Sequence, residues 1–132
     1  MAIFGVLNGR IDGLITYGKT LNFVAIPETI DGETIISIGD SAFNGCSNLT
    51  SVGIGNGVTS ICNSAFEDCY KFSEVYYKGM ESEWMNRDIR SPNTELTSAT
   101  QYYFIQNETN VPMDGGNYWH YDENGEIVVW TI

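Results

Sequence analysis

Basic residues are scarce in this sequence, and their scarcity excludes one class of partner. The chain has 6 Lys and Arg residues against 17 Asp and Glu residues, which gives a formal net charge of −11. No Lys or Arg lies between Lys19 and Lys71, and none follows Arg90. Because phosphate backbones are bound by clustered cations, we expect no direct nucleic-acid binding. An acidic surface does attract a basic protein partner.

Long apolar runs are also missing. No window approaches the roughly 18 uninterrupted apolar residues that a membrane-spanning helix needs, so we expect no membrane insertion. The N-terminal stretch MAIFGVLNGRIDG has no basic region, and its apolar run breaks at Asn8-Gly9. It is therefore not a typical secretory signal, and a chain that starts natively at Met1 is expected in the cytoplasm.

Catalytic motifs are absent. His120 is the single histidine, so no H-E-x-x-H can form, and no G-x-S-x-G occurs. The run Gly53-Ile54-Gly55-Asn56-Gly57 lacks the Lys-Ser/Thr of a phosphate loop and is interpreted as a turn at the end of a strand. We expect no enzymatic activity, no cofactor and no metal site.

Cysteine is too rare for a disulfide framework. Cys46, Cys62 and Cys69 form no C-x-x-C pair and no zinc spacing, and their number is odd. Cys46 and Cys69 occupy matching positions in a repeat, so we interpret them as small buried residues.

That repeat is the strongest feature present. The stretch IISIGDSAFNGCSNLTSV (Ile35–Val52) returns as VTSICNSAFEDCYKFSEV (Val58–Val75), with the apolar positions kept and those between them varied. This pattern is typical of units that stack on one another. A shorter motif, L-x-x-V-x-I, begins at Leu21, Leu49, Phe72 and, weakly, at Leu96 (with Ala99 and Gln101). The spacings of 28, 23 and 24 residues fall in the range of leucine-rich repeats.

The motif predicts the structure of each coil. The alternating V-x-I part predicts a short strand, and neighbouring strands should form a parallel ladder. Asp40 and Asn63 are placed to begin short helical turns over Ser41–Phe43 and Ser64–Phe66. Phe43 and Phe66 should then enter the core between coils. Asn93 stands three residues before Leu96, as each repeat cysteine does before its own motif, which predicts a further inward-facing site.

The remaining segments predict how the stack ends. Asn8-Gly9 and Asn124-Gly125 predict turns of capping β-hairpins. A short helix is expected over Met80–Arg87, and a strand over Tyr102–Phe104. We expect one domain over residues 1–132, divided into an N-terminal hairpin cap (1–20), repeat coils with a closing unit (21–104) and a C-terminal hairpin (105–132).

The full pattern, I-x-x-x-A-F-x-x-C-x-x-L-x-x-V-x-I, resembles the BspA-like leucine-rich repeats over about Leu21 to Phe104. The resemblance implies a right-handed β/α solenoid with a short parallel strand ladder and short helical turns. It implies adhesion or binding rather than catalysis. It also implies a bacterial cell-surface or secreted location, which differs from the location expected from the N-terminus.

Aromatic residues gather in the C-terminal half, where 12 of the 17 follow Cys69. Alternation puts Trp119 and Tyr121 on one face of their strand, and Tyr118 and His120 on the other. The aromatics either close an irregular core or form a binding patch, since Tyr and Trp favour interfaces. The candidate partner-binding residues are Tyr76, Tyr77, Tyr102, Tyr103, Trp119 and Tyr121.

Three functional hypotheses stay open. The first is a recognition module that binds a protein through its repeat face or its aromatic half. The second is a small acidic, phage-type inhibitor of a basic nucleic-acid-binding enzyme. The third is a carbohydrate-binding module, since YWHYDENGEIVVW is similar to one unit of choline- or glucan-binding repeats. The sequence does not fix an oligomeric state.

Overall fold

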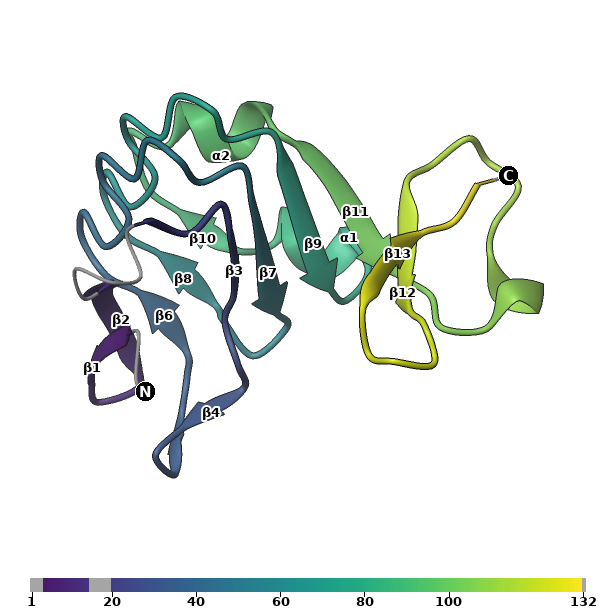
Figure 1. Ribbon diagram of the computed structural model, residues 1–132, viewed down its shortest axis with the longest axis horizontal. Coiled ribbons are helices and arrows are strands. Elements are labelled where there is room, and N and C mark those ends of the chain that lie inside the picture. The colour runs from purple at the N-terminus through teal and green to yellow at the C-terminus, as the bar shows by residue number, and fades with distance from the viewer. Residues whose placement is uncertain (1–3, 15–19, 132) are drawn as a thin grey trace.

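The computed structural model describes residues 4–14 and 20–131 of the chain. Most of its strands lie in two sheets that cross successive coils, with orders β1-β2-β6-β8-β10 and β13-β12-β11-β9-β7-β3, and β4 and β5 form a separate pair (Figure 1). The elements are β1 (Phe4–Leu7), β2 (Arg10–Leu14), β3 (Phe23–Ala25), β4 (Thr29–Ile30), β5 (Glu33–Thr34), β6 (Ser37–Ile38), β7 (Ser51–Gly55), β8 (Ser60–Ile61), β9 (Glu74–Lys78), α1 (Glu81–Met85), β10 (Asp88–Ile89), α2 (Thr94–Ser98), β11 (Thr100–Phe104), the 3-10 helix η2 (Glu108–Asn110), β12 (Tyr118–Tyr121) and β13 (Ile127–Val129).

The larger sheet contains the predicted ladder of repeat strands. β3, β7 and β9 are parallel, and their register aligns Val24, Val52 and Val75. These three valines are at most 1% exposed. Side chains alternate between the two faces of a strand, so Ile54 and Tyr77, two residues further on, also point into the core. The motif therefore predicted this ladder correctly, and the coils do stack in a solenoid-like repeat fold.

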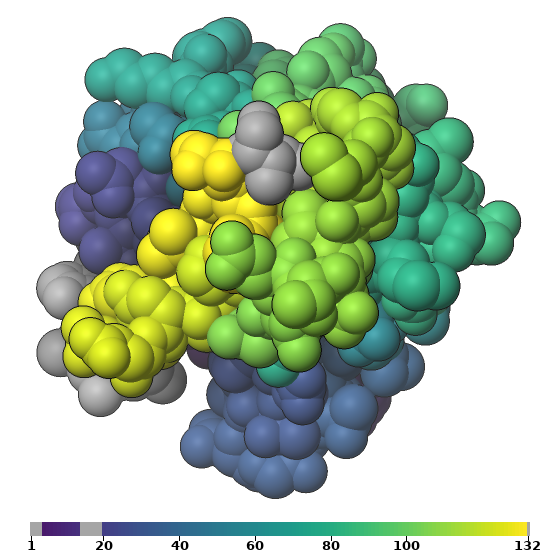
Figure 2. Space-filling view, turned by 90° about the vertical axis from the view of Figure 1, so that its right-hand side faces the viewer, coloured from purple at the N-terminus to yellow at the C-terminus, as the bar shows by residue number. Residues whose placement is uncertain are grey.

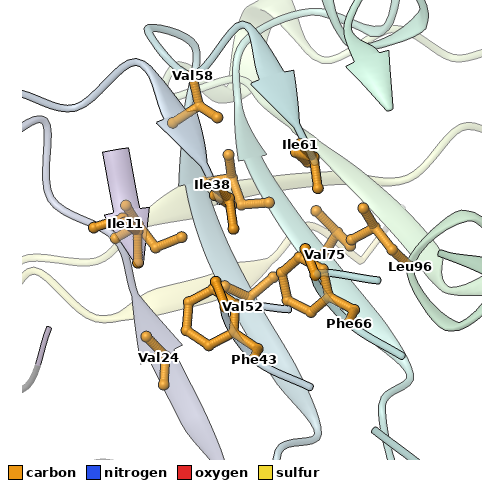
Figure 3. Packing of buried hydrophobic residues seen from close by; sticks show 14 of the residues in the cluster. Ile11, Val24, Ile38, Phe43, Val52, Val58, Ile61, Phe66, Val75 and Leu96 are labelled. Carbon is orange, nitrogen blue, oxygen red and sulfur yellow. The ribbon is translucent and has the colours of Figure 1, made fainter. Parts of the chain in front are cut away.

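A second ladder is not predicted by the motif. β2, β6, β8 and β10 are also parallel neighbours, and Ile11, Ile38 and Ile61 stand opposite one another in it. Strands of two residues are too short to give an alternation signal. The core lies between the two sheets, where Phe43 and Phe66 are fully buried with ring centroids 5.0 Å apart (Figure 3).

The expectation of helical turns over Ser41–Phe43 and Ser64–Phe66 is wrong. Ser41 and Ser64 have φ angles of 57° and 61°, in the left-handed region that an α-helix does not contain. Backbone N–H groups of the first turn donate instead to carbonyl oxygens of the second turn. These bonds run from Ser41 to Asn63, from Phe43 to Ala65 and from Gly45 to Glu67, at 2.7–2.9 Å. The turns therefore form a ladder between coils.

The last coil is two residues longer than the motif predicts. The motif places Ala99 beside Val75 and Gln101 beside Tyr77, but Gln101 pairs with Val75 and Tyr103 pairs with Tyr77. Helix α2 contains the buried Leu96 and precedes the strand directly, so the added length lies in this segment. An even shift keeps each side chain on its face of the sheet, and Tyr103 rather than Gln101 occupies the core position.

Two antiparallel hairpins flank the coils. β1 and β2 pair around Asn8 and Gly9, whose φ angles of 51° and 76° are those of the turn that Asn-Gly predicts. β12 and β13 also pair, and their loop contains the predicted Asn124-Gly125, with a φ angle of 78° at Gly125. The loop runs from Asp122 to Glu126, and Asp122 Oδ1 accepts hydrogen bonds from Asn124 N and Glu126 N.

A third hairpin, β4–β5, forms in the residues that lengthen the first repeat interval. Its turn residues Asp31 and Gly32 have φ angles of 50° and 82°. The helix predicted over Met80–Arg87 is present as α1, with Trp84 buried and Met80 and Met85 exposed. The strand predicted at Tyr102–Phe104 is β11.

Candidate binding groove on the open face of the larger sheet

One face of the larger sheet packs on the core, and the other face is open. The strand register aligns the residues of the open face in rows across β3, β7, β9, β11 and β12. These rows are Phe23, Ser51, Glu74 and Thr100; then Ala25, Gly53, Tyr76 and Tyr102; then Gly55, Lys78, Phe104 and Trp119.

Gly53 and Gly55 of β7 carry no side chains on this face and form the bottom of a hollow, here called the glycine floor. A Cβ atom added to Gly53 would lie 3.7 Å from Ala25 Cα, and one added to Gly55 would lie 3.8 Å from Glu28 Cγ. Both are ordinary contacts, and neither residue has a positive φ. The backbone would therefore accept a Cβ atom at either position, and strands favour residues with side chains over glycine. Glycine inside a strand often marks a place where another molecule or backbone approaches closely.

Aromatic rings form one wall beside the glycine floor. Tyr76 stacks on Tyr102 with ring centroids 5.2 Å apart. Trp119 packs against Phe104 at 4.8 Å and against Tyr121 at 4.9 Å. The Trp119 indole N–H also donates to Tyr77 O at 2.9 Å, which anchors β12 to β9. The wall is held by ring packing and by this buried hydrogen bond.

The floor and wall enclose a groove of about 680 Å³. β3 and the start of the β4–β5 hairpin line one side through Phe23, Ala25 and Glu28. The β12–β13 hairpin lines the other through Tyr121, the loop residues Gly125 and Glu126, and Ile127. The yellow β12–β13 hairpin and, lower in the view, the blue β4–β5 hairpin are both visible in Figure 2.

The groove has an uneven charge. Among the described residues that line it, Lys78 is the one cation, and Glu28 and Glu126 are the two anions. Lys78 Nζ lies 3.7 Å from Glu28 Oε1, and 5.5 Å and 5.8 Å from the ring centroids of Tyr121 and Phe104. The ammonium is therefore shared between a carboxylate and two aromatic faces, and one carboxylate remains without a counter-ion in the groove.

Tyr76 and Tyr103 stay neutral at physiological pH. Burial, together with the hydrogen bond from its hydroxyl to Glu74, raises the pKa of Tyr76. Burial raises the pKa of Tyr103 to about 12. These phenols therefore act as apolar surfaces with a hydrogen-bonding end, and not as acid or base groups.

The six predicted partner-binding residues do not share one surface. Tyr77 and Tyr103 face the core and are 0% and 8% exposed. Trp119 is 2% exposed beneath its aromatic neighbours. Tyr76, Tyr102 and Tyr121 are half-buried on the open face, and Tyr76, Trp119 and Tyr121 line the groove. Partner binding through any of the six stays a prediction.

Sequence reasoning missed the residues that give the groove its depth and charge. Gly53 and Gly55 were predicted to lie in a turn, but they are strand residues of β7, and the turn contains only Asn56 and Gly57 of that run. A usable signal was present, since the motif V-x-I places Gly53 and Gly55 on the face opposite Val52 and Ile54. No sequence pattern marked Lys78 as a groove residue, because its neighbours across the sheet are set by the strand register.

The other candidates of the sequence analysis have structural roles. His120 stacks on Trp130 with ring centroids 3.7 Å apart. Cys46 and Cys69 are buried, and Cys69 Sγ lies 3.0 Å from Phe43 O. Within residues 4–14 and 20–131 no group of three or more His, Cys, Asp or Glu side chains could hold a metal ion. No helix in these same ranges is long and apolar enough to span a membrane.

Stacked coils between two parallel ladders, with one sheet face open, define a solenoid-like repeat protein. The BspA type leucine rich repeat region, a family model with 6 copies, matches residues 16–109, and the chain belongs to this family.

A solved structure that matches part of the chain is a leucine rich cell surface protein from Faecalibacterium prausnitzii A2-165. The two are 34% identical over 56% of this chain and 18% of that one, with a TM-score of 0.48. The present chain therefore spans a small part of that protein's length. A comparison with curated proteins gave no match.

Proposed function

We propose that this chain is a non-catalytic recognition module that binds a protein partner in the groove of the larger sheet. The glycine floor carries the proposal. Gly53 and Gly55 occupy strand positions that would accept a Cβ atom without a clash, and their lack of side chains leaves a hollow beside an aromatic wall. A sheet selected for stability alone would fill these positions with β-branched or aromatic residues.

Membership of a leucine-rich repeat family supports an interaction role at a bacterial surface. In this proposal the coils are a rigid support, and the β1–β2 and β12–β13 hairpins close the two ends of the stack. The β12–β13 hairpin has a second role, because it supplies Tyr121 and Ile127 to the groove. The whole chain then acts as a single unit in recognition.

The ring geometry favours a protein partner over a glycan. Sugar rings stack on aromatic faces that are flat and open. Here Trp119 is 2% exposed, and Phe104 and Tyr121 pack against it at interplanar angles of 55° and 84°. Such a tilted cluster suits apolar side chains, for which Tyr and Trp are common partners in interfaces.

The test fills the groove from its floor. Gly53→Leu places a side chain in the hollow and adds a residue with higher strand propensity, so the variant should fold at least as stably as the wild-type chain. Ser47→Leu is the matched control, because Ser47 is exposed and does not line the groove. Each immobilised variant is exposed to surface-protein extracts, and captured proteins are quantified by mass spectrometry.

We expect a set of proteins that the wild-type chain and Ser47→Leu retain and Gly53→Leu loses. If Gly53→Leu keeps the whole captured set, the groove is not the binding site. The same three proteins applied to a glycan array test the carbohydrate hypothesis, because a glycan retained in a Gly53-dependent way would assign the groove to sugars.

A further inference from the structure

β13 is an edge strand of the larger sheet. It ends the six-stranded sheet, and no described strand pairs with its outer side. Trp130 N donates to Tyr118 O, and Asp122 N donates to Glu126 O, both at 2.9 Å. Hydrogen-bonded and non-bonded pairs alternate along an antiparallel ladder. The N–H and C=O groups of Ile127 and Val129 therefore point away from β12.

This edge is short, with three residues, but its other features leave it open to pairing. Besides short length, proteins block edge strands with Lys, Pro, bulges or covering segments. β13 reads Ile-Val-Val, and its pairing with β12 is regular, with Trp119 opposite Val129 and Tyr121 opposite Ile127. An unblocked edge of β-branched residues is a template for an added strand.

The free edge is continuous with the groove. Ile127 lines the groove, and Val129 lies on the same face of β13, because the two are separated by two residues. A strand added to β13 would extend the curled sheet from its end at the β12–β13 hairpin (Figure 1). Every second side chain of that strand would then point to the groove side, toward the glycine floor of β7.

The charged residues that line the groove indicate which charge an added strand would carry. Glu126 adjoins β13 and lines the groove, and Glu28 lines the opposite side. Lys78 pairs with Glu28 at 3.7 Å, which leaves Glu126 for an incoming cation. The net charge of −11 favours the approach of a basic segment as well.

We propose that the groove takes an extended basic peptide segment of the partner, which adds to β13 as a new edge strand. Its backbone pairs with the outward groups of Ile127 and Val129. Its inward side chains fill the hollow above Gly53, and a Lys or Arg pairs with Glu126. This inference rests on the proposed function and goes beyond it by naming the form and charge of the ligand.

The experiment selects ligands from a displayed library of random linear peptides on the purified chain. Selected peptides are then synthesised and titrated against three variants by calorimetry. Val129→Pro removes one outward N–H, whereas Val129→Thr keeps that N–H and a β-branched side chain and is the matched control. Gly53→Leu fills the hollow.

We expect enriched peptides that contain Lys or Arg, with affinity reduced about tenfold or more by Val129→Pro and by Gly53→Leu, and unchanged by Val129→Thr. If Val129→Pro fails to fold, peptides N-methylated at alternate residues replace it. Methylation on the set of amides that faces β13 should abolish binding, and methylation on the other set should not.

Three outcomes overturn the proposal. The first is a library that yields no ligand, and the second is a set of enriched peptides without basic residues. The third is binding that is lost in Gly53→Leu but kept in Val129→Pro, which rejects strand addition and leaves the groove as the binding site. Protein capture that depends on Gly53 without any peptide ligand would likewise preserve the proposed function and reject this inference.

Discussion

Asn93 ends the ladder of turn hydrogen bonds at the last coil. Between the first turn (41–45) and the second turn (63–67), three backbone N–H groups donate to backbone carbonyl oxygens. Between the second turn and residues 92–95, one acceptor is a backbone carbonyl and two are side-chain oxygens. The three bonds run from Ser64 to Pro92 O, from Phe66 to Asn93 Oδ1 and from Asp68 to Glu95 Oε2. Side-chain oxygens thus replace the carbonyls of an absent further turn.

We predict that Asn93→Ala destabilises the fold by about 2–4 kcal/mol, since each buried polar group left without a partner costs about 1–3 kcal/mol. Asn93 is 4% exposed, accepts from Phe66 N at 2.9 Å and donates to Cys62 O at 2.8 Å. Urea unfolding followed by near-ultraviolet circular dichroism measures the change. Asn44→Ala, at an exposed turn position, is the control and should change little. Equal urea midpoints for the Asn93→Ala and Asn44→Ala variants would contradict a stabilising role of the Asn93 hydrogen bonds.

Spacing alone predicted Asn93 as an inward-facing site, and its burial confirms this. Its hydrogen bonds could not be predicted, because they join residues 27 and 31 positions apart through the turn geometry. The positive φ of Ser41 and Ser64 was equally hidden, since serine is not a residue that signals this conformation.

At the scale of one coil, the aromatic residues of the A-F motif join neighbouring units. Phe43 and Phe66 stack at 5.0 Å, and Phe66 contacts Phe72 at 5.3 Å. Each ring therefore buries part of another coil as well as its own. In stacked repeats this contact between neighbours is what makes separate units fold together.

We predict that Phe43→Ala costs about 3–5 kcal/mol, as for other large buried aromatics. Because the rings couple the coils, unfolding should remain one transition at a lower midpoint when followed by circular dichroism and by tryptophan fluorescence. Tyr70→Ala is the control, since Tyr70 is 76% exposed. Two separate transitions in the Phe43 variant would show that the coils do not depend on one another.

The elements differ in how far sequence could predict them. The V-x-I motif predicted β3, β7 and β9 because its alternation of apolar positions is kept in all three copies of the motif. The fourth strand was placed two residues early, because α2 adds length that the weak Leu96 motif does not reveal. Predicting the groove would have required the register of all these strands and the position of the β12–β13 hairpin. The sequence therefore predicted only that aromatic residues gather in this half of the chain.

Across the whole molecule, buried weak acids link the fold to pH. Burial raises the pKa of the Cys69 thiol from its ordinary value of 9.0 to about 12. Burial also raises the pKa of Tyr103 from 10.0 to about 12. Folding therefore requires these groups to keep protons that the unfolded chain releases at lower pH. The charge of −11 adds repulsion that grows as further groups ionise.

We predict that stability is lost as pH rises. Below about pH 9 both groups are protonated in the folded and unfolded chains, so their full contribution is present. Between about pH 9 and 12 the unfolded chain binds fewer protons than the folded chain, and the free energy of unfolding falls with each step in pH. Urea midpoints measured from about pH 8 to about pH 11 should therefore decrease steadily.

A variant can separate the contribution of the Cys69 thiol to this loss of stability from that of the Tyr103 phenol. Cys69→Ala lacks the group that ionises first, so its decline should begin nearer to pH 10, where the phenol of Tyr103 ionises in the unfolded chain. The comparison uses the shape of the pH profile, because the substitution also lowers the midpoint at every pH by leaving a small cavity. A wild-type midpoint that stays constant to about pH 11 would mean that ionised Cys69 and Tyr103 are accommodated in the folded chain. An unchanged onset in the variant would instead assign the decline to tyrosines and to the overall charge.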